Sequence, residues 1–207
     1  EEDTYVIGQD DSKSYKPRTE NDLNIVKEVW RLLVEADLVI GHNAKSFDIK
    51  KINARFIYHN LGPPSPYRVV DTKTEIKKVA RFESNKLDDL GEQLGLGRKL
   101  EHEGWELWEG CYNGDKKSWA KMKAYNKQDV DLLERLYLRV RPFVKNHPSL
   151  DTYSETTVCP KCGSSNLVRR GYQFNQTTKY ARIKCKDCRG WSRSPVNLQE
   201  KRPLVSI

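Results

Sequence analysis

Four of the five cysteines in this 207-residue sequence stand in two Cys-x-x-Cys pairs. Cys159 and Cys162 form the first pair, and Cys185 and Cys188 form the second pair after 22 intervening residues. Thiolates at this spacing are typical ligands of a closed, tetrahedral zinc site. An iron–sulfur site or a pair of redox dithiols stays open as an alternative. The pairs predict a four-cysteine Zn²⁺ site within a small β zinc ribbon, since short alternating segments lie between them.

Basic and aromatic side chains are interleaved within this predicted ribbon. Cations meet phosphates and flat rings meet bases, which is what the binding of a single strand requires. The side chains that we expect to contact such a substrate are Arg169, Arg170, Tyr172 and Arg182. The alternative is a small domain whose aromatic residues form its core, and we expect Phe174 and Trp191 to lie partly in that core.

A carboxylate lies on the apolar face of the last helix that the sequence predicts, over residues 118–140. Met122, Leu132 and Leu136 follow one another at helical spacing, and Asp129 lies in the same stripe. An unpaired carboxylate there costs on the order of several kcal/mol, so it needs a partner or a metal. A structural aspartate bonded to nearby backbone or to an arginine is the alternative.

A second carboxylate stands where a strand turns into a helix. The apolar run at residues 38–40 predicts a buried strand that ends at Gly41, and Asp48 then opens the next predicted helix. An aspartate at a helix start is often only a cap. However, Asn43 and Phe47 precede Asp48 in the pattern Asn-x-x-x-Phe-Asp. This pattern is more specific when it occurs together with the aspartate of the predicted helix over residues 118–140.

Two segments together resemble the DEDD superfamily of 3′–5′ exonucleases, which have a ribonuclease H-like fold. Residues 43–48, Asn-Ala-Lys-Ser-Phe-Asp, resemble the second exonuclease motif, and residues 125–129, Tyr-Asn-Lys-Gln-Asp, resemble the third motif in its tyrosine form. Residues 85–90 resemble the helix that such enzymes place between these motifs. The resemblance covers about residues 20–145. The ribbon resembles those of nucleases and transposases from phages and mobile elements.

The resemblance implies a two-metal hydrolysis of nucleic acid phosphodiesters. Asp48 and Asp129 would bind two Mg²⁺ or Mn²⁺ ions, which clamp the attacking and leaving oxygens. Tyr125 would orient the attacking water, so the implied catalytic residues are Asp48, Tyr125 and Asp129. Asn43 and Phe47 would lie along the 3′ end of the substrate, which we expect to be DNA with a single-stranded 3′ end.

The first motif of the family is missing. That motif is Asp-x-Glu on the first central strand, and no Asp-x-Glu occurs in this sequence. Asp10 and Asp11 follow a strand-like segment, but their spacing is wrong. We therefore expect an N-terminally incomplete domain, or a separate chain that supplies the N-terminal strands, or a degenerate nuclease. The chain alone is expected to be a poor nuclease.

Strands alternate with helices in the first 148 residues, which predicts an α/β fold with a largely parallel sheet. The expected strands are at 5–7, 38–40 and 67–70, and the expected helices are at 19–35, 47–59, 76–80, 87–94 and 118–140. Asp71, at the end of a strand, suits an outer-shell role or a turn equally well. Residues 1–148 are therefore read as a ribonuclease H-like domain of exonuclease type, and residues 149–207 as a zinc ribbon with a basic tail.

Composition and charge exclude several classes of protein. Hydrophobic residues make up 37% and charged residues 32% of the chain, so an integral membrane protein is excluded. No signal peptide is visible, and we expect a cytoplasmic, intracellular protein of phage or prophage origin. Residues 151–207 hold 11 basic and four acidic side chains, whereas the first 150 hold 26 and 25. A basic tail suggests nucleic acid as a partner, and a lysine-rich surface without a ligand is the alternative.

Three functions remain open from the sequence. The first is a metal-dependent 3′–5′ exonuclease whose ribbon assists substrate binding. The second is a catalytically inactive module that binds nucleic acid. The third is a transposase-like nuclease, which needs an acidic residue on the first strand and does not need Tyr125.

Overall fold

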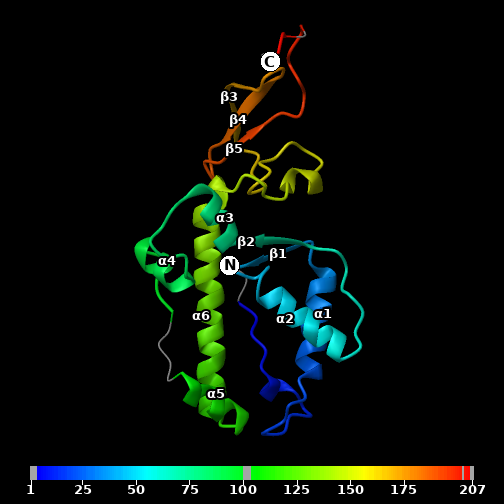
Figure 1. Ribbon diagram of the computed structural model, residues 1–207, viewed down its shortest axis with the longest axis vertical. Helices are drawn as coiled ribbons and strands as arrows, with labels where there is room; N and C mark the ends of the chain where they lie inside the picture. Colours follow the sequence, from blue (N-terminus) through cyan, green and yellow to red (C-terminus); the bar gives the residue numbers. More distant parts are fainter. Residues whose placement is uncertain (1–3, 100–103, 202, 206–207) are drawn as a thin grey trace. The chain divides into compact units, whose positions relative to one another are not determined.

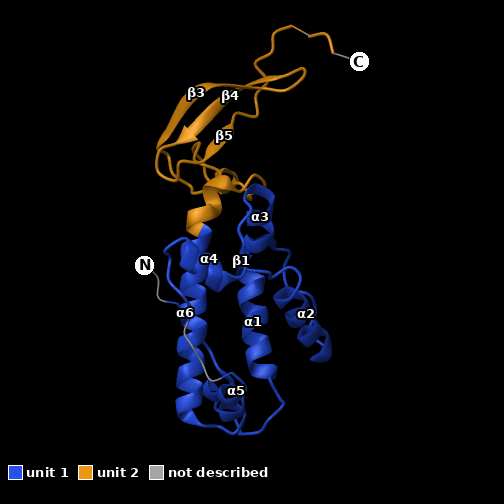
Figure 2. Ribbon diagram, turned by 60° about the vertical axis from the view of Figure 1, so that its left-hand side comes forward, with its two compact units in different colours: residues 1–137 blue, residues 138–207 orange. Residues whose placement is uncertain are grey.

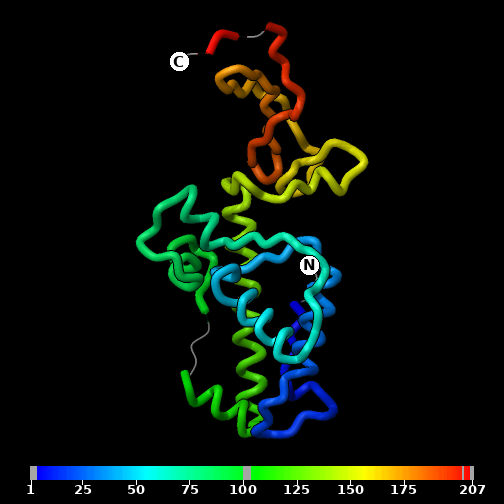
Figure 3. Tube along the Cα trace, turned by 45° about the vertical axis from the view of Figure 1, so that its right-hand side comes forward, coloured from blue at the N-terminus to red at the C-terminus, as the bar shows by residue number. Residues whose placement is uncertain are grey.

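The computed structural model describes residues 4–99, 104–201 and 203–205. The chain forms two compact units, Glu1–Tyr137 and Leu138–Ile207 (Figure 2). The course of the chain through each unit can be followed in Figure 3. The domain boundary predicted after residue 148 lies within the second unit and stays a prediction. Within the described part of the chain, no helix is both long enough and apolar enough to cross a bilayer.

A two-stranded parallel sheet organises the first unit. Strand β1 (Leu38–Gly41) pairs with β2 (Arg68–Asp71), and the register places Gly41 opposite Asp71. Both strands therefore end at the same edge of the sheet. Helix α2 (Asp48–Tyr58) lies in the connection between them, as a parallel pair requires. Residues that follow β1 and β2 meet at this edge, which is where functional side chains gather in open α/β sheets.

Helix α1 (Leu23–Glu35) packs against α2 through one apolar cluster. Val26 and Leu33 of α1 and Phe56 of α2 are its buried members. The apolar period of residues 23–33 predicted this face, so both helices lie where the sequence places them. Salt bridges of Asp22 to Arg55 at 2.5 Å and to His59 at 2.6 Å add a polar tie between the two helices.

The longest helix, α6 (Lys116–Val140), contributes the central buried residues of the first unit (Figure 1). Leu132 and Leu136 are 0% exposed, as is Leu90 of the short helix α4 (Leu87–Gln93). Helix α3 (Thr72–Val79) adds Ile76. The predicted apolar stripe of α6 is confirmed, and Asp129 lies one turn from its most buried part.

Two predictions about the first unit are wrong. Residues 5–7 form no strand, and Thr4 beside them instead donates a hydrogen bond to Asp131 of α6. Helix α5 (Trp105–Tyr112) was not predicted, because it is short, interrupted by Gly110, and leaves both of its tryptophans exposed. A small cluster of Leu107, Cys111, Met122 and Trp119 holds this helix to α6. Cys111 is a buried free thiol.

The second unit contains an antiparallel sheet in the order β3-β4-β5. Its strands are β3 (Leu167–Phe174), β4 (Lys179–Cys185) and β5 (Trp191–Arg193), after the single-turn 3-10 helices Arg141–Phe143 and Leu150–Tyr153. Another 3-10 turn, Gln9–Asp11, belongs to the first unit. Phe174 and Trp191 are 67% and 45% exposed, so their predicted place in the core is wrong. The buried side chains of this unit gather around the cysteines instead and include Val144, Val158, Cys159 and Cys185.

Candidate functional site

A pocket of about 670 Å³ opens at the carboxyl end of β1. It brings together four of the residues that the sequence analysis selected, from the β1–α2 turn and from α6: Asn43, Phe47, Asp48 and Asp129. These residues lie up to 86 positions apart in the sequence. Their common pocket is the first structural support for treating the two motifs as one site.

The turn that carries Asn43 is held by a buried aspartate. Asp71 is 1% exposed, and its carboxylate accepts hydrogen bonds from the backbone N–H groups of Asn43 (3.0 Å), Lys45 (3.1 Å) and Thr74 (3.2 Å). Asn43 has φ +69°, a left-handed conformation that asparagine tolerates. Gly41 is also required, because a Cβ there would lie 2.4 Å from the Cβ of Ala44. Of the two roles expected for Asp71, the structure shows the turn role.

Asp48 is the first residue of α2, and its side chain is exposed. Phe47 beside it is 56% exposed, and the ammonium of Lys51 lies 5.9 Å from the centre of its ring. An exposed carboxylate at the start of a helix and an exposed ring at the rim of a pocket are both available to a ligand.

Asp129 is the most constrained carboxylate of the pocket. Its Oδ2 lies 2.5 Å from the ammonium of Lys99, whereas its Oδ1 is buried and has no hydrogen-bond partner in the part of the chain that the structure describes. The same ammonium donates to the hydroxyl of Tyr125 at 3.2 Å. Burial lowers the pKa of Lys99, but the hydrogen bonds to Asp129 and Tyr125 outweigh it and raise that pKa. Lys99 is therefore a fixed cation on the carboxylate that the sequence analysis assigned to a metal.

Sequence reasoning missed Lys99. Its backbone N–H donates to Asp88 of α4 at 2.8 Å, and Gln128 of α6 donates to the carbonyl of Arg98 at 3.2 Å. Gly97, two residues before Lys99, has φ +117°, a conformation that favours glycine. No local pattern marks this lysine. The sequence indicated only that Asp129, on an apolar helix face, needs a partner.

His42 also lines the pocket and was not selected from the sequence. Its Nε2 lies 2.9 Å from the carbonyl oxygen of Asn85, so this nitrogen is the donor, and its Nδ1 lies 2.9 Å from the hydroxyl of Thr72. Burial lowers the pKa of His42, which favours the neutral ring at pH 7. The ring joins the end of β1 to α3 and to the segment before α4.

The donor set of this pocket fits a hard divalent cation in part. Mg²⁺ is often bound through one or two carboxylates, with water and substrate phosphate completing its shell. Asp48 and Asp129 supply two carboxylates, and the unpartnered Oδ1 of Asp129 is a buried acceptor that lacks a cation or donor. Asp10 and Asp11 bond to Lys123 at 2.8 and 2.6 Å and do not line the pocket.

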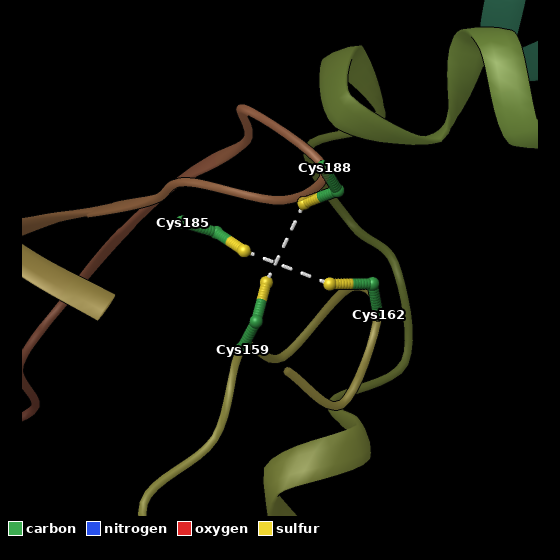
Figure 4. A group of neighbouring side chains, drawn as sticks. All are labelled: Cys159, Cys162, Cys185 and Cys188. Atoms are coloured by element: carbon green, nitrogen blue, oxygen red, sulfur yellow. Dashed lines mark hydrogen bonds between the residues drawn. The ribbon is translucent and has the colours of Figure 1, made fainter. Parts of the chain in front are cut away.

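The four paired cysteines form one cluster in the second unit (Figure 4). Their sulfur atoms all lie within 4.8 Å of one another, with 3.7 Å between Cys159 and Cys188 and 3.7 Å between Cys162 and Cys185. A tetrahedron with Zn–S bonds of about 2.3 Å has edges of about 3.8 Å. The cluster could therefore hold one zinc ion. Among the described residues, no other group of three or more His, Cys, Asp or Glu side chains has this closeness.

Backbone amides support the thiolate form of one member of this cluster, Cys185. Burial raises the pKa of the Cys185 thiol, but the N–H groups of Cys188 and Asp187 and the neighbouring thiols outweigh it and lower the pKa to about 7. Gly190 donates its N–H to the sulfur of Cys188 at 3.4 Å. Burial raises the pKa of Cys162 and, together with the neighbouring thiols, that of Cys188 to about 12. A thiolate is the form that binds metal, so at these two residues a bound cation would have to favour it.

The predicted substrate residues of the ribbon lie on two different faces. Arg170 and Gly171 together oppose Arg182, and Gly171 has φ +70°, which defines a β-bulge in β3. Beyond the bulge, Tyr172 shares a face with Arg169, whose guanidinium lies 5.1 Å from its ring. Arg182 projects from the opposite face, where it lies 4.8 Å from the ring of Trp191. Arg169 and Tyr172 are thus separated from Arg170 and Arg182.

The fold and the pocket define an α/β protein of nuclease-like architecture, followed by a cysteine-clustered β ribbon. The sequence matches a family model of the RNase H superfamily over residues 3–141, and the chain belongs to that superfamily. A comparison with curated proteins found no match. Membership in the superfamily indicates a nuclease-like hydrolase whose substrate is nucleic acid.

Proposed function

We propose that this chain acts as a metal-dependent 3′–5′ exonuclease of the tyrosine subclass of the DEDD superfamily when the carboxylates of the missing first motif are supplied. The observation that carries the proposal is the pocket at the end of β1, whose lining includes Asn43, Phe47, Asp48 and Asp129. Oδ1 of Asp129 is buried there and has no hydrogen-bond partner among the described residues. Two motifs of one catalytic pattern, far apart in sequence, line one cavity in a domain of the RNase H superfamily.

The roles of the residues follow from their positions. Asp48 and Asp129 hold Mg²⁺ or Mn²⁺, which when bound polarises the phosphodiester and lowers the pKa of a bound water. The hydroxyl of Tyr125, placed beside Lys99, orients the attacking water. Phe47 offers its exposed ring to the terminal base, and Asn43 holds the turn beside it. Single-stranded DNA with a free 3′ end is the proposed substrate.

The ribbon assists by holding the nucleic acid that the first unit hydrolyses. Its structural ion is Zn²⁺ on the four cysteines. Arg170 and Arg182 are exposed and form no salt bridge within the described residues, so their charge is available to phosphates. Phosphate contacts of this kind bind any sequence and weaken as salt rises.

One observation favours a second function, an inactive module that binds nucleic acid. Lys99 already neutralises Asp129 at 2.5 Å, and a lysine in that place makes a metal unnecessary for the stability of the carboxylate. In this alternative, the pocket holds a strand end without cutting it.

The deciding experiment replaces Asp129, and the control replaces Asp131 on the same helix. Asp129→Asn should reduce Mn²⁺-dependent shortening of a 5′-labelled single strand by more than roughly 100-fold, a larger loss than outer-shell partners give. Asp131→Asn should stay near the wild type, because Asp131 accepts a hydrogen bond from Thr4 and does not line the pocket. Denaturing gels over a Mn²⁺ titration report both the rate and the direction of cleavage.

Three results would separate the functions. Shortening from the 3′ end that disappears in Asp129→Asn supports the exonuclease. Equal activity in wild type and Asp129→Asn contradicts a catalytic role for this pocket. Strand binding that is indifferent to Mn²⁺, without any cleavage, supports the inactive module. Tyr125→Phe should lower the rate while Mn²⁺ affinity is kept, since only the hydroxyl that orients the water is removed.

A further inference from the structure

One face of the ribbon is more basic than the other and carries a cavity. We call it the Trp191 face, and from the strand register its members are Arg170, Gln173, Tyr180, Arg182, Lys184, Trp191 and Arg193. The opposite face, which we call the Tyr172 face, carries Arg169, Tyr172, Phe174, Lys179 and Ile183. The bulge at Gly171 decides which residues of β3 belong to each face.

The cavity on the Trp191 face has a volume of about 550 Å³. Its lining combines exposed rings, Phe143 and Trp191, with the basic side chains of Lys145, Arg182 and Arg193. No carboxylate is among the described residues that line it. A second cavity of about 600 Å³ is lined by Leu167 and Ile183 of the other face, shares Arg193 with the first cavity, and includes the carboxylate of Asp151.

The cations around the rings lie within cation–π distance of them. The guanidinium of Arg182 lies 4.8 Å from the ring of Trp191 and is anchored by a hydrogen bond from its Nε to the carbonyl of Arg170 at 3.0 Å. The ammonium of Lys184 lies 5.5 Å from the same ring, and Arg193 lies 3.8 Å from the ring of Tyr180. Within the described residues, none of these three cations forms a salt bridge. Fixed and unneutralised charge beside flat rings is the arrangement that binds a single strand.

We infer that the Trp191 face is the surface that grips single-stranded nucleic acid, with bases stacked on Trp191 and Phe143 and phosphates on Arg182, Arg193 and Lys145. The amide of Gln173 lies in the same lining and can bond to a base edge. A cavity of this size suits one or a few nucleotides and is too small for a duplex. The inference rests on the proposed function and refines it, because Tyr172 and Arg169 lose the role that the sequence suggested for them.

The test compares matched substitutions on the two faces of the full, zinc-loaded chain. Trp191→Leu and Arg193→Ala remove a ring and a cation from the Trp191 face, whereas Tyr172→Leu and Arg169→Ala do the same on the Tyr172 face. The readout is fluorescence anisotropy of labelled oligo-dT without Mg²⁺ or Mn²⁺, with zinc content measured for each variant to show that the ribbon is folded. Trp191→Leu should weaken binding by roughly 10-fold or more, and Tyr172→Leu by less than about twofold.

An abasic strand separates stacking from charge. It should bind the wild type and Trp191→Leu equally, while Arg193→Ala should still weaken it. Equal losses for the variants of both faces, or a loss in Trp191→Leu that persists on the abasic strand, would overturn the inference. Displacement of oligo-dT by an acidic peptide, together with no effect of Trp191→Leu, would instead identify a protein-docking face.

A small substrate keeps this test independent of the proposed function. Hydrolysis of the p-nitrophenyl ester of thymidine 5′-phosphate needs only the pocket of the first unit, so Asp129→Asn should abolish it. Failure of Asp129→Asn to affect this ester contradicts the proposed function. Failure of Trp191→Leu to affect strand binding contradicts only the assignment of the face.

Discussion

At the scale of single residues, the central feature of the pocket is the Asp129 carboxylate, whose two oxygens have different surroundings. Oδ2 of Asp129 is paired with Lys99, and Oδ1 is buried without a partner. A buried acceptor that lacks a partner is costly, so such an atom in a functional pocket marks a place for a ligand or an ion. Lys99 and a divalent metal would compete for the same carboxylate, because both bring positive charge to it.

Lys99→Ala should therefore raise the affinity for metal and lower the stability of the metal-free protein. Without the ammonium, Asp129 is left unpaired, at a cost of about 1–2 kcal/mol of the free energy of unfolding. Mn²⁺ should restore that stability and bind several-fold more tightly than in the wild type, since it no longer displaces a cation. Thermal unfolding with and without Mn²⁺, together with calorimetric titration, measures both effects.

Lys86→Ala is the control for this prediction. Lys86 lines the same pocket but forms no salt bridge within the described residues. It should change neither the stability nor the Mn²⁺ affinity appreciably. Weaker Mn²⁺ binding in Lys99→Ala would show that Lys99 supports the metal site and does not compete with it.

At the scale of elements, the end of the parallel strand pair positions the pocket. Asp71 closes β2 and, from there, holds the turn after β1 through two backbone N–H groups while it caps α3 through a third. One buried carboxylate therefore sets the entry into α2, and with it the place of Asp48. The side chain acts on the site through the backbone, without lining the pocket.

Asp71→Ala should destabilise the first unit by about 3 kcal/mol, because three backbone N–H groups lose a charged, buried acceptor. Asp71→Asn should cost less, since its amide oxygen still accepts part of these bonds. Asp37→Ala is the control, because Asp37 is exposed just before β1. Urea unfolding measures the three variants. Unchanged stability together with lost Mn²⁺ affinity would instead assign Asp71 to the outer shell of a metal.

At the scale of the whole molecule, the two units depend on different sources of stability. The first unit has an apolar core with Leu90, Leu132 and Leu136 fully buried. The second unit buries few apolar side chains, and its cysteines are among the most buried residues it has, with Cys159 at 2% and Cys185 at 1% exposure. A unit with so small a core relies on its metal to fold.

Zinc removal should consequently unfold the second unit and leave the first standing. Cys162→Ser or a chelator should make residues 155–194 sensitive to protease, while the thermal transition of the first unit is retained. Cys111→Ser is the matched control, because Cys111 is buried in the first unit, outside the cluster, and should not change zinc content. Unfolding of both units on chelation would contradict independent folding. A ribbon that stays folded on chelation would contradict a structural role for zinc.

Much of the candidate site was readable from local patterns. The spacing of the cysteine pairs predicted the cluster, because a Cys-x-x-Cys turn brings two sulfurs together whatever the rest of the chain does. Helical periodicity placed Asp129 on a buried face of α6, since that period is a property of neighbouring residues. The strand-to-helix steps at Gly41 and Asp71 were also visible, and they fixed the edge at which Asn43 and Asp48 lie.

Only the tertiary structure decided which residues meet. Lys99 bonds to Asp129, 30 positions later in the sequence. Because Lys99 lies in a segment without helical or strand periodicity, no local pattern identified it. Strict alternation along β3 would have placed Tyr172 beside Arg170, but the extra residue at the Gly171 bulge moves Tyr172 to the face of Arg169. The sequence by itself determined the elements and the ligand types, because these depend on near neighbours. The partner of Asp129 and the faces of the ribbon depend on long-range packing and strand register, which only the folded chain settles.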